Sequence, residues 1–442
     1  MEEDHFESLY PENARHFEIE KLLNFVREGN SCQLLGLPGV GRSDLLELLA
    51  YNKKIRDKHL GRDDLQMLFV MVDFSEIRKR PLFDAMKFLF LSLADSLRDQ
   101  HMMEEYRVVN ESFREALSFH DELVLFQELK QVVDFLAIQK KLILVFLFDR
   151  FEEYVPSVTG EFFTNLRILR NRAKYRFSVI FSIDRPLEIL LDPMLLSDFY
   201  EFVAGHLVYI KFYDEASNNF ILSYLEGLTK KKVSKTAYSE ILRLTGGYAK
   251  LTRLGIEAWL ANDGKEKNME DFLSTQKSIQ AALAEIWLSL SPAEQSDILH
   301  NTYEDPAVDR YLEESGLIKD KTIQIPLFAI WVKSSKALVA SVEEKIVYDE
   351  NTDSIRKGEI ILSDSLTSAE FRLLWYLLQN QGRVIERNEV ISIVWTSAKS
   401  TAGITDQAVD QLIFRLRRKI EEDPNKPLYL QTVKGRGFKF VG

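Results

Sequence analysis

The stretch LLGLPGVGRSDLLELL, residues 34–49, decides the fold of the first part of this chain. A short apolar run ends at Gly36, and an apolar spacing typical of a helix begins after Ser43. Gly39 and Gly41 lie between the two. Glycines at such a turn let backbone N–H groups curl around phosphate oxygens, and the helix N-terminus adds partial positive charge. The stretch predicts a phosphate-binding loop, and the alternative is a structural turn before a helix.

The spacing within this stretch follows the pattern G-x-x-x-x-G-K-[ST], with one exception. Arg42 stands where the pattern has lysine, and its planar guanidinium does not have the geometry of a compact ammonium. Ser43 keeps the hydroxyl that Mg²⁺ needs. The residues predicted to bind a nucleotide here are Gly36, Pro38, Gly39, Val40, Gly41, Arg42, Ser43 and Asp44.

A second motif, KKLILVFLFDRFEEY at residues 140–154, strengthens this interpretation. Its apolar run ends at Asp149, which is the Walker B arrangement of a buried parallel strand that delivers a carboxylate toward Mg²⁺. The alternative is a core strand followed by an acidic turn. The two motifs in this order favour binding of ATP or ADP with Mg²⁺ as cofactors.

Strand and helix patterns alternate around the two motifs. Three further strands are predicted at 67–74, 176–184 and 206–212, and helices at 81–97 and 121–139. This alternation predicts an α/β fold with a parallel sheet covered by helices on both faces.

Over roughly residues 11–336 the chain resembles the AAA+-related STAND ATPases, which are signal-transducing switch NTPases, with some likeness to origin-recognition-type ATPases. Four segments carry the resemblance: ARHFEIEKLLNFV (14–26) as the entry segment, DRFEEY (149–154) as a "DxFEE" Walker B motif, FSIDRP (181–186) as the fourth core strand, and TGGYAKLTRL (245–254) as the lid motif.

The resemblance implies a role for each of several residues. Asp149 and Ser43 would hold Mg²⁺, and Glu152 or Glu153 would polarise the attacking water. Ser182 and Arg185 would lie near the γ-phosphate. Lys250 or Arg253 would be the cation of the lid.

Three positions depart from the resembled pattern. Arg42 replaces the loop lysine, Arg150 follows Asp149 where many AAA+ ATPases have glutamate, and Ala249 stands where proline is usual in the lid. These departures affect turnover more than binding, and slow Mg²⁺-dependent hydrolysis would suit a switch.

The region after the sheet is predicted to be helical. A lid is expected over 214–275, and a winged-helix-like module over 276–340 resembles the one that commonly follows the lid in STAND proteins. Ser291 before Pro292 is a plausible helix N-cap. Because the surface of this module is acidic, we expect it to pack against the rest of the chain rather than to bind DNA.

The last segment, 347–442, has a different pattern. Short alternating strands precede LTSAEFRLLWYLL, in which Thr367 and Glu370 form a capping box. Two more helices follow, at RNEVISIVW and ITDQAVDQLIFRLRRKIEED, and PLYLQTVKGRGFKFVG predicts a closing hairpin. The inward residues of the third helix are Val409, Leu412, Ile413, Leu416 and Ile420.

This segment is similar to the OmpR/PhoB-type winged-helix DNA-binding domain, whose L-T-x-x-E-x-x-L-L, V-D-x-x-I-x-x-L-R-x-K and T-V-x-G-x-G-[YF]-x-F motifs it contains. The resemblance implies that the third helix enters the major groove. Either Leu412 or Phe414 could then contact a thymine methyl. The residues expected at base edges are Gln407, Asp410, Gln411, Phe414 and Arg415, and those expected at the sugar-phosphate backbone or minor groove are Arg417, Arg418, Thr432, Lys434 and Arg436.

Composition sets the cellular context. The 442 residues are 46% hydrophobic and 28% charged, which suits folded domains, and the single cysteine, Cys32, excludes an internal disulfide. No signal peptide or membrane-spanning run is predicted, so a cytoplasmic, bacterial-type location is expected, at the nucleoid when bound to DNA. The last 28 residues hold 8 basic and 3 acidic side chains within a chain of net charge −11, which points to a polyanion partner for that end alone.

Together these patterns predict a P-loop core with its entry segment (1–213), the lid, the middle module and a terminal DNA reader. The preferred hypothesis is an ATP/ADP switch that acts as a sequence-specific transcription regulator. Nucleotide would control homo-oligomer or tandem-dimer assembly on double-stranded DNA, with an unknown protein or ligand as a possible activator. The alternatives are a constitutive DNA-binding or scaffold protein with a structural nucleotide, and a catalytic ATPase with a vestigial reader.

Overall fold

The chain folds into two compact units, Met1–Lys333 and Ser334–Gly442. The structure is a computed structural model, and the residues that it describes are 5–60, 66–262, 264, 268–303, 306–339, 346–349, 354–357, 360–395, 406–421, 424, 427–433 and 435–441.

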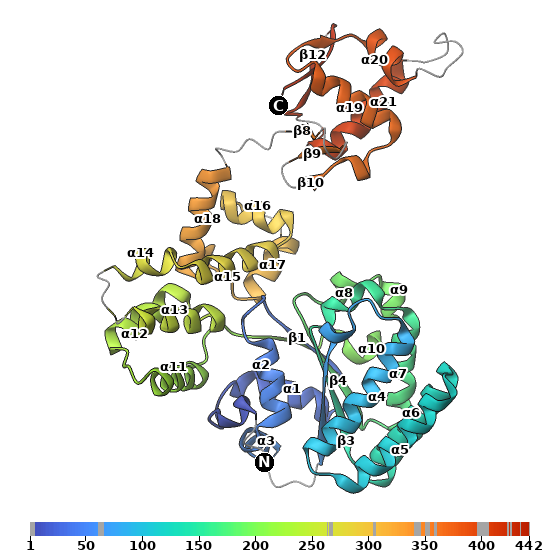
Figure 1. The fold of residues 1–442 in the computed structure, drawn as a ribbon, viewed down its shortest axis with the longest axis vertical. Helices are drawn as coiled ribbons and strands as arrows, with labels where there is room; N and C mark the ends of the chain where they lie inside the picture. The colour runs from blue at the N-terminus through green and yellow to red at the C-terminus, as the bar shows by residue number, and fades with distance from the viewer. Residues whose placement is uncertain are drawn as a thin grey trace. The chain divides into compact units, whose positions relative to one another are not determined.

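A parallel five-stranded sheet in the order β2-β3-β4-β1-β5 organises the first unit (Figure 1). All five strands predicted from apolar runs are present. Every residue of β3 is buried, as a central strand of a covered parallel sheet requires. The strands are β1 (Cys32–Leu35), β2 (Met67–Asp73), β3 (Ile143–Asp149), β4 (Phe177–Ile183) and β5 (Leu207–Tyr209).

Helices cover both faces of this sheet, because side chains alternate between the faces along each strand. Leu34 packs with one group of helices and Leu35 with the other. On the Leu34 face lie α1 (His16–Arg27), α2 (Arg42–Tyr51) and α3 (Lys53–Leu60). On the Leu35 face lie α4 (Leu82–Asp99), α5 (Met103–Phe119), α6 (Glu122–Asp134) and α7 (Gly160–Arg172), followed after β4 by the short helices α8 (Leu187–Leu190), α9 (Pro193–Leu196) and α10 (Tyr200–Val203).

The glycine-bearing turn lies between β1 and α2. With the strand order, this position makes the first unit a P-loop NTPase fold, and the predicted fold class is confirmed. Among the helices that the structure describes, none has the length and apolar character needed to cross a bilayer.

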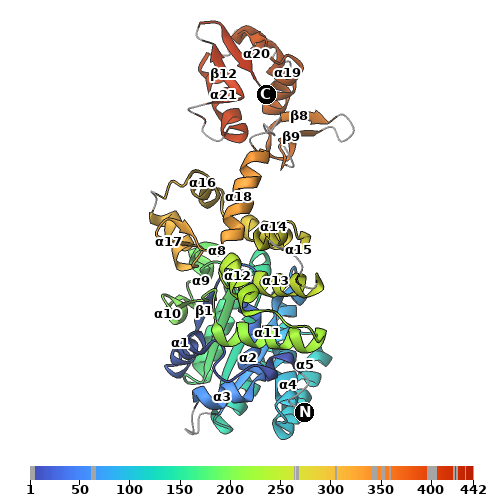
Figure 2. The same cartoon turned by 90° about the vertical axis from the view of Figure 1, so that its left-hand side faces the viewer.

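The lid and the middle module follow β5. Gly246 and Gly247 adopt φ values of 60° and 72° and end α12, so α13 begins as a separate helix after this pair. The elements are α11 (Glu215–Thr229), α12 (Lys235–Thr245), α13 (Ala249–Ala261), α14 (Met269–Ser274), α15 (Lys277–Leu288), α16 (Pro292–His300), α17 (Pro306–Glu314), β6 (Ile318–Lys319), β7 (Thr322–Ile323) and α18 (Pro326–Val339). Figure 2 shows α14 and α15 beside α12 and α13.

The predicted cap of α16 is present. Ser291 accepts a hydrogen bond from the backbone N–H of Glu294, whose carboxylate accepts one from the Ser291 N–H at 2.7 Å. Glu294 is therefore held in place by the backbone of its own helix.

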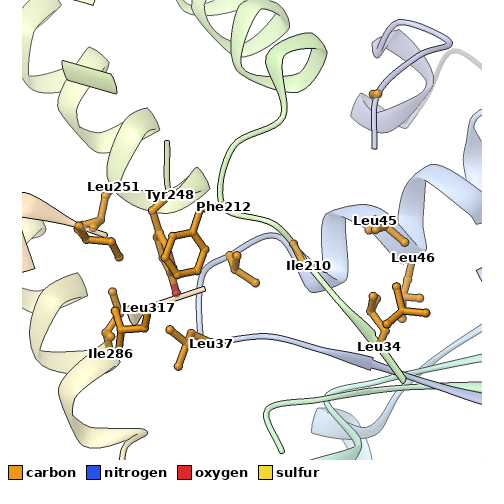
Figure 3. Close-up of a cluster of buried hydrophobic side chains, with 14 of the residues drawn as sticks. Leu34, Leu37, Leu45, Leu46, Ile210, Phe212, Tyr248, Leu251, Ile286 and Leu317 are labelled. Carbon is orange, nitrogen blue, oxygen red and sulfur yellow. The ribbon is translucent and has the colours of Figure 1, made fainter. Parts of the chain in front are cut away.

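Core, lid and middle module share one hydrophobic cluster. Figure 3 shows Leu34 and Leu46 of the sheet and α2, Tyr248 of the lid, and Ile286 and Leu317 of the middle module in this cluster, and all five side chains are buried. These three segments are therefore packed as one body.

The second unit is a winged helix. Its helices α19, α20 and α21 pack against two antiparallel three-stranded sheets, in the orders β10-β9-β8 and β11-β13-β12. Thr367 and Glu370 form the predicted capping box of α19. The elements are β8 (Ile346–Asp349), β9 (Ser354–Lys357), β10 (Ile360–Ile361), α19 (Ser368–Gln379), β11 (Val384–Ile385), α20 (Arg387–Val394), α21 (Asp406–Ile420), β12 (Leu430–Val433) and β13 (Gly437–Phe440).

Tyr248 connects the lid to the glycine loop, because its buried hydroxyl donates a hydrogen bond to the carbonyl of Pro38. We predict that Tyr248→Phe lowers the free energy of unfolding by about 1 kcal/mol, the usual net contribution of one hydrogen bond, in urea denaturation of the full chain. Tyr238→Phe is the matched control, since its hydroxyl bonds to Asn219 at the surface at 3.3 Å. Equal losses in the two variants would contradict the assigned role of Tyr248.

Candidate functional sites

The glycine loop presents the start of α2 to solvent without a side-chain cap. Gly39 and Gly41 have φ values of 85° and 101°, which other residues rarely adopt, and a Cβ added at Gly39 would lie 2.8 Å from the Lys250 side chain. Gly41 is the N-cap of α2 and makes no side-chain capping bond. The N–H groups of the first turn therefore remain available to an anion.

A cavity of about 580 Å³ opens at this helix start, within the usual range for small-molecule sites. It brings together most of the residues predicted from the sequence. Those that line it are Pro38, Gly39, Gly41, Arg42, Ser43, Asp44, Glu152, Glu153, Lys250 and Arg253, whereas Gly36, Val40, Asp149, Ser182 and Arg185 do not.

Arg42, the residue in the lysine position, is paired with Glu152. Its Nη2 lies 2.6 Å from Glu152 Oε1, and the two side chains are 10% and 20% exposed. Among the described residues, neither the Arg42 Nη1 nor the Glu152 Oε2 has a hydrogen-bond partner, although both atoms are buried. The predicted phosphate ligand and the predicted catalytic carboxylate are thus held together.

This pairing controls the protonation of both groups. Burial works to lower the pKa of the Arg42 guanidinium, but the carboxylates of Glu152, Asp184 and Asp149 together outweigh it and raise that pKa, so the arginine stays charged. Burial raises the pKa of Glu152, and Arg42 offsets this effect only in part.

Asp149 ends β3 as predicted and is 1% exposed. It accepts a hydrogen bond from the Ser182 hydroxyl at 2.9 Å, which orients its carboxylate. The Arg150 guanidinium lies 3.5 Å from Asp149 and 2.9 Å from Asp73, the register neighbour of Asp149 on β2. A carboxylate at the end of a buried strand suits Mg²⁺, which takes few protein ligands and completes its shell with phosphate and water.

The second candidate glutamate, Glu153, is ion-paired with Arg78. Since Glu152 is bound by Arg42, both carboxylates that were predicted to polarise water have cationic partners. This arrangement is suited to slow rather than rapid hydrolysis.

Arg185 does not face the cavity, which differs from its predicted position near the γ-phosphate. Its guanidinium bonds to the Glu294 carboxylate at 2.6 and 2.8 Å and lies over the Tyr311 ring at 4.1 Å. The Tyr311 hydroxyl donates to the carbonyl of Asp184 at 2.7 Å. The buried Glu294 thus binds Arg185 to the middle module.

The lid closes over the loop through Lys250. Its backbone N–H donates to the carbonyl of Gly39 at 3.1 Å, and its ammonium is ion-paired with Glu285. Arg253, the alternative lid cation, also lines the cavity and bonds to Glu257 at 2.8 Å.

Sequence reasoning missed several cavity residues. Arg15 was noted only as part of the entry segment, yet its guanidinium donates to the carbonyls of Lys211 at 2.6 Å and Val40 at 3.1 Å, and so joins that segment to the chain just after β5 and to the loop. No motif identified the others because they come from segments distant in sequence from the loop. They are Phe6, Glu7, Tyr10, Ser217, Asn218, Ile221 and Glu285.

In the second unit, α21 buries one face and exposes the other. The predicted inward residues are buried, and this overturns one expectation: Leu412 is 0% exposed and cannot touch a thymine methyl, whereas Phe414 is 48% exposed. The other predicted base-reading residues, Gln407, Asp410, Gln411 and Arg415, are exposed, and Lys434 lies outside the described residues.

Three of the α21 residues that were predicted to contact DNA instead contact other residues of the second unit. Arg417 donates to the carbonyl of Leu430 at 2.9 Å and to the Thr432 hydroxyl at 2.7 Å, and burial lowers the pKa of its guanidinium. Asp410 is paired with Arg387 at 2.6 Å. Arg415 lies 3.8 Å from the Glu370 carboxylate.

Arg418 differs from Arg417 in its surroundings. It is exposed on the same last turn of α21, and its guanidinium makes no hydrogen bond or ion pair with the residues that the structure describes. Of the two arginines predicted at phosphates, Arg417 therefore connects the helix to the β12–β13 wing and Arg418 faces solvent.

Breaking the Arg42–Glu152 pair from one side leaves a buried charge without compensation. We predict that Glu152→Gln lowers the free energy of unfolding by roughly 3 kcal/mol, and that the same substitution is nearly neutral in an Arg42→Met background, in a double-mutant cycle. Glu153→Gln is the control and should change stability by less than about 1 kcal/mol, because its partner Arg78 is 59% exposed. Additive single-variant effects would disprove the coupling.

Comparisons with known proteins bear on the two units separately. Residues 364–440 match the family described as "Transcriptional regulatory protein, C terminal". The sensory transduction protein RegX3 of Mycolicibacterium smegmatis is 45% identical over 78 residues, 18% of this chain and 33% of that protein. The alkaline phosphatase synthesis transcriptional regulatory protein PhoP of Bacillus subtilis is 45% identical over 74 residues, 17% of this chain and 30% of that protein.

The chain thus spans about a third of the length of the curated relatives that it matches. Among solved structures, the Walker-type ATPase of Pyrococcus abyssi is 16% identical to this chain. The structural alignment covers 74% of this chain and 100% of that protein, with a TM-score of 0.47. Residues 364–440 belong to the C-terminal domain family of OmpR/PhoB-type transcriptional regulators, and they follow a unit that has a P-loop NTPase fold.

Proposed function

We propose that this protein is a nucleotide-responsive transcription regulator: ATP or ADP binds the first unit with Mg²⁺ and changes how strongly the second unit binds double-stranded DNA. The observation that carries the proposal is the buried, half-partnered Arg42 at the uncapped start of α2, inside a cavity of about 580 Å³, in a chain that also carries an OmpR/PhoB-type domain. We further propose that the first unit is of the STAND type.

The chain's own groups define how phosphate would be held. Backbone N–H groups of the loop and the free Nη1 of Arg42 would donate to phosphate oxygens. Ser43 and Asp149 would hold Mg²⁺, which supplies charge neutralisation between the phosphates when bound.

A phosphate bound through the free Nη1 of Arg42 would then compete with Glu152 for the Nη2 of the same guanidinium. An incoming phosphate that takes over Arg42 releases the Glu152 carboxylate, which can then accept a proton from a water in the cavity. The exchange of Glu152 for phosphate on Arg42 would thus couple nucleotide binding to release of the catalytic base. The need for this exchange favours slow turnover.

The end of β4 supports transmission of this change. Ser182 binds Asp149 on one side of the strand end, and Arg185, three residues later, binds Glu294 of the middle module. A shift of Asp149 toward Mg²⁺ would therefore move a segment that also holds the middle module. We propose that this shift governs assembly of a homo-oligomer or tandem dimer on DNA in the cytoplasm, with a protein or ligand activator as a possible further input.

On the DNA side, the exposed face of α21 would enter the major groove, as expected of its family. Gln407, Gln411 and Phe414 would reach base edges, and Arg418 would meet a phosphate.

A second candidate function is a constitutive DNA-binding protein with a structural nucleotide. The mutual pairing of Arg42 with Glu152 and of Arg150 with Asp149 favours it, because both pairs keep catalytic groups occupied.

The coupling is tested by measuring DNA and nucleotide binding on the full chain. We expect calorimetry to detect Mg²⁺-dependent binding of ADP and ATP, and fluorescence anisotropy on a duplex selected from a random library to show an affinity that differs between the two nucleotides. Asp149→Asn should abolish that difference and any slow hydrolysis while it preserves DNA binding. Nucleotide binding with no change in DNA affinity would instead support the structural-nucleotide alternative, and no binding of either nucleotide would refute the proposal.

The two arginines at the end of α21 should behave differently. We predict that Arg418→Ala reduces the slope of log K against log salt concentration for DNA binding by about one, because the variant loses one contact with a DNA phosphate. The melting temperature should not change, because the Arg418 side chain faces solvent. Arg417→Ala should lower the melting temperature of the second unit, because it removes two hydrogen bonds to β12. Unchanged slopes in the Arg418 variant would contradict the phosphate assignment.

A further inference from the structure

The cavity extends beyond the phosphate loop along α2. Leu45 and Leu48 of this helix line it, and Leu48 lies six residues after Arg42, about 9 Å farther along the helix axis. Phe6, Tyr10 and Ile221 also line it, together with Glu7, and Tyr10 lies by the C-terminal end of α2 because the amide of Asn52, the C-cap of that helix, donates to its carbonyl. The three apolar and aromatic side chains suit a flat ring.

Buried contacts fix the aromatic wall. Asn52 is 1% exposed, and its amide donates to the carbonyls of Glu7 at 2.8 Å and Tyr10 at 3.1 Å. The Tyr10 ring packs on Phe220 of α11 with centroids 4.1 Å apart. The segment that precedes α1 is therefore packed against both α2 and α11.

Two buried polar groups of α11 line the same cavity and lack partners. In the part of the chain that the structure describes, no group bonds to the Nδ2 of Asn218 or to the hydroxyl of Ser217. Asn218 is 6% exposed. A buried amide donor without a partner is unfavourable by itself, so its presence beside an open cavity points to a ligand acceptor.

The first turn of α11 holds these groups in place. The Asp214 carboxylate accepts from the backbone N–H of Ser217 at 2.8 Å and from that of Arg15 at 3.3 Å. Arg15 in turn donates to the carbonyl of Val40 in the glycine loop at 3.1 Å. One chain of hydrogen bonds thus connects the phosphate loop to the start of α11.

Resting on the nucleotide site proposed above, we infer that Asn218 reads the base of the bound nucleotide and selects adenine. A carboxamide offers a donor and an acceptor side by side, and the N7/N6 edge of adenine presents the complementary pair, a ring nitrogen acceptor next to the exocyclic amino donor. The corresponding N7/O6 edge of guanine presents two acceptors, and a carboxamide can satisfy only one of them. The Ser217 hydroxyl supplies a second polar contact at the same edge.

The inference is tested by calorimetry on the full chain, with ADP, GDP and inorganic pyrophosphate as ligands in Mg²⁺ buffer. We expect wild type to prefer ADP to GDP by about tenfold or more, as one bidentate base contact allows. Asn218→Ala should weaken ADP binding by about tenfold and leave GDP and pyrophosphate affinities within about twofold of wild type.

Two further variants keep the result interpretable. Asn218→Asp has nearly the same shape and loses the donor, so it should fold and also lose the ADP preference. Asn219→Ala is the matched control on the next residue of α11, whose exposed side chain bonds to Tyr238 instead, and it should bind ADP as wild type does.

Each outcome bears on the inference. Unchanged ADP affinity in both Asn218 variants, or an equal loss of pyrophosphate affinity, would overturn base reading by Asn218 while the nucleotide site itself stands. A wild-type chain that binds none of the three ligands would overturn the nucleotide site and this inference together.

Discussion

The nucleotide site that we propose depends on the pairing of Arg42 with Glu152. A cation at the start of α2 is needed to receive phosphate, but a buried charge without a counterion is strongly unfavourable. Glu152, 2.6 Å away, neutralises it. The Glu152 carboxylate, which is proposed to accept a proton from water, thus pairs with the guanidinium nitrogen that a phosphate could otherwise bind. Arginine serves this exchange well because its fork can hold a carboxylate and still offer a second nitrogen to another anion.

The second organising feature is the shared core. Tyr248 of the lid, Ile286 of the middle module and Leu34 of β1 belong to one buried cluster, so the parts that surround the cavity are not independent. Polar contacts follow the same route, since the end of β4 touches Asp149 through Ser182 and Glu294 through Arg185. The proposed transmission of a displacement from the site to α16 rests on these contacts, because packed interfaces respond by switching partners rather than by gradual deformation.

Prediction from sequence succeeded best in the winged helix. The apolar stripe of α21, the capping box at Thr367 and the wing hairpin all depend on local spacing, which a sequence displays directly. The sequence was less informative about the partners of charged residues. Arg417 and Arg418 are adjacent and chemically identical, yet one bonds to β12 and the other faces solvent, and only the position of the neighbouring strand separates them.

The sequence alone determined the parallel sheet, the loop between β1 and α2, the carboxylate at the end of β3 and the domain type of the last segment. The first three features rest on the periodicity of apolar residues and on glycine positions, which act over a few residues, and the domain type rests on the resemblance of three local motifs to a known family. Only the tertiary structure decided that Glu152 pairs with Arg42, that Arg185 turns toward Glu294 instead of the cavity, and that Asn218 lines the cavity that opens at the glycine loop. The physical reason is that a charged or polar side chain takes its partner from whatever folding brings within about 3 Å, and no local pattern encodes that neighbour.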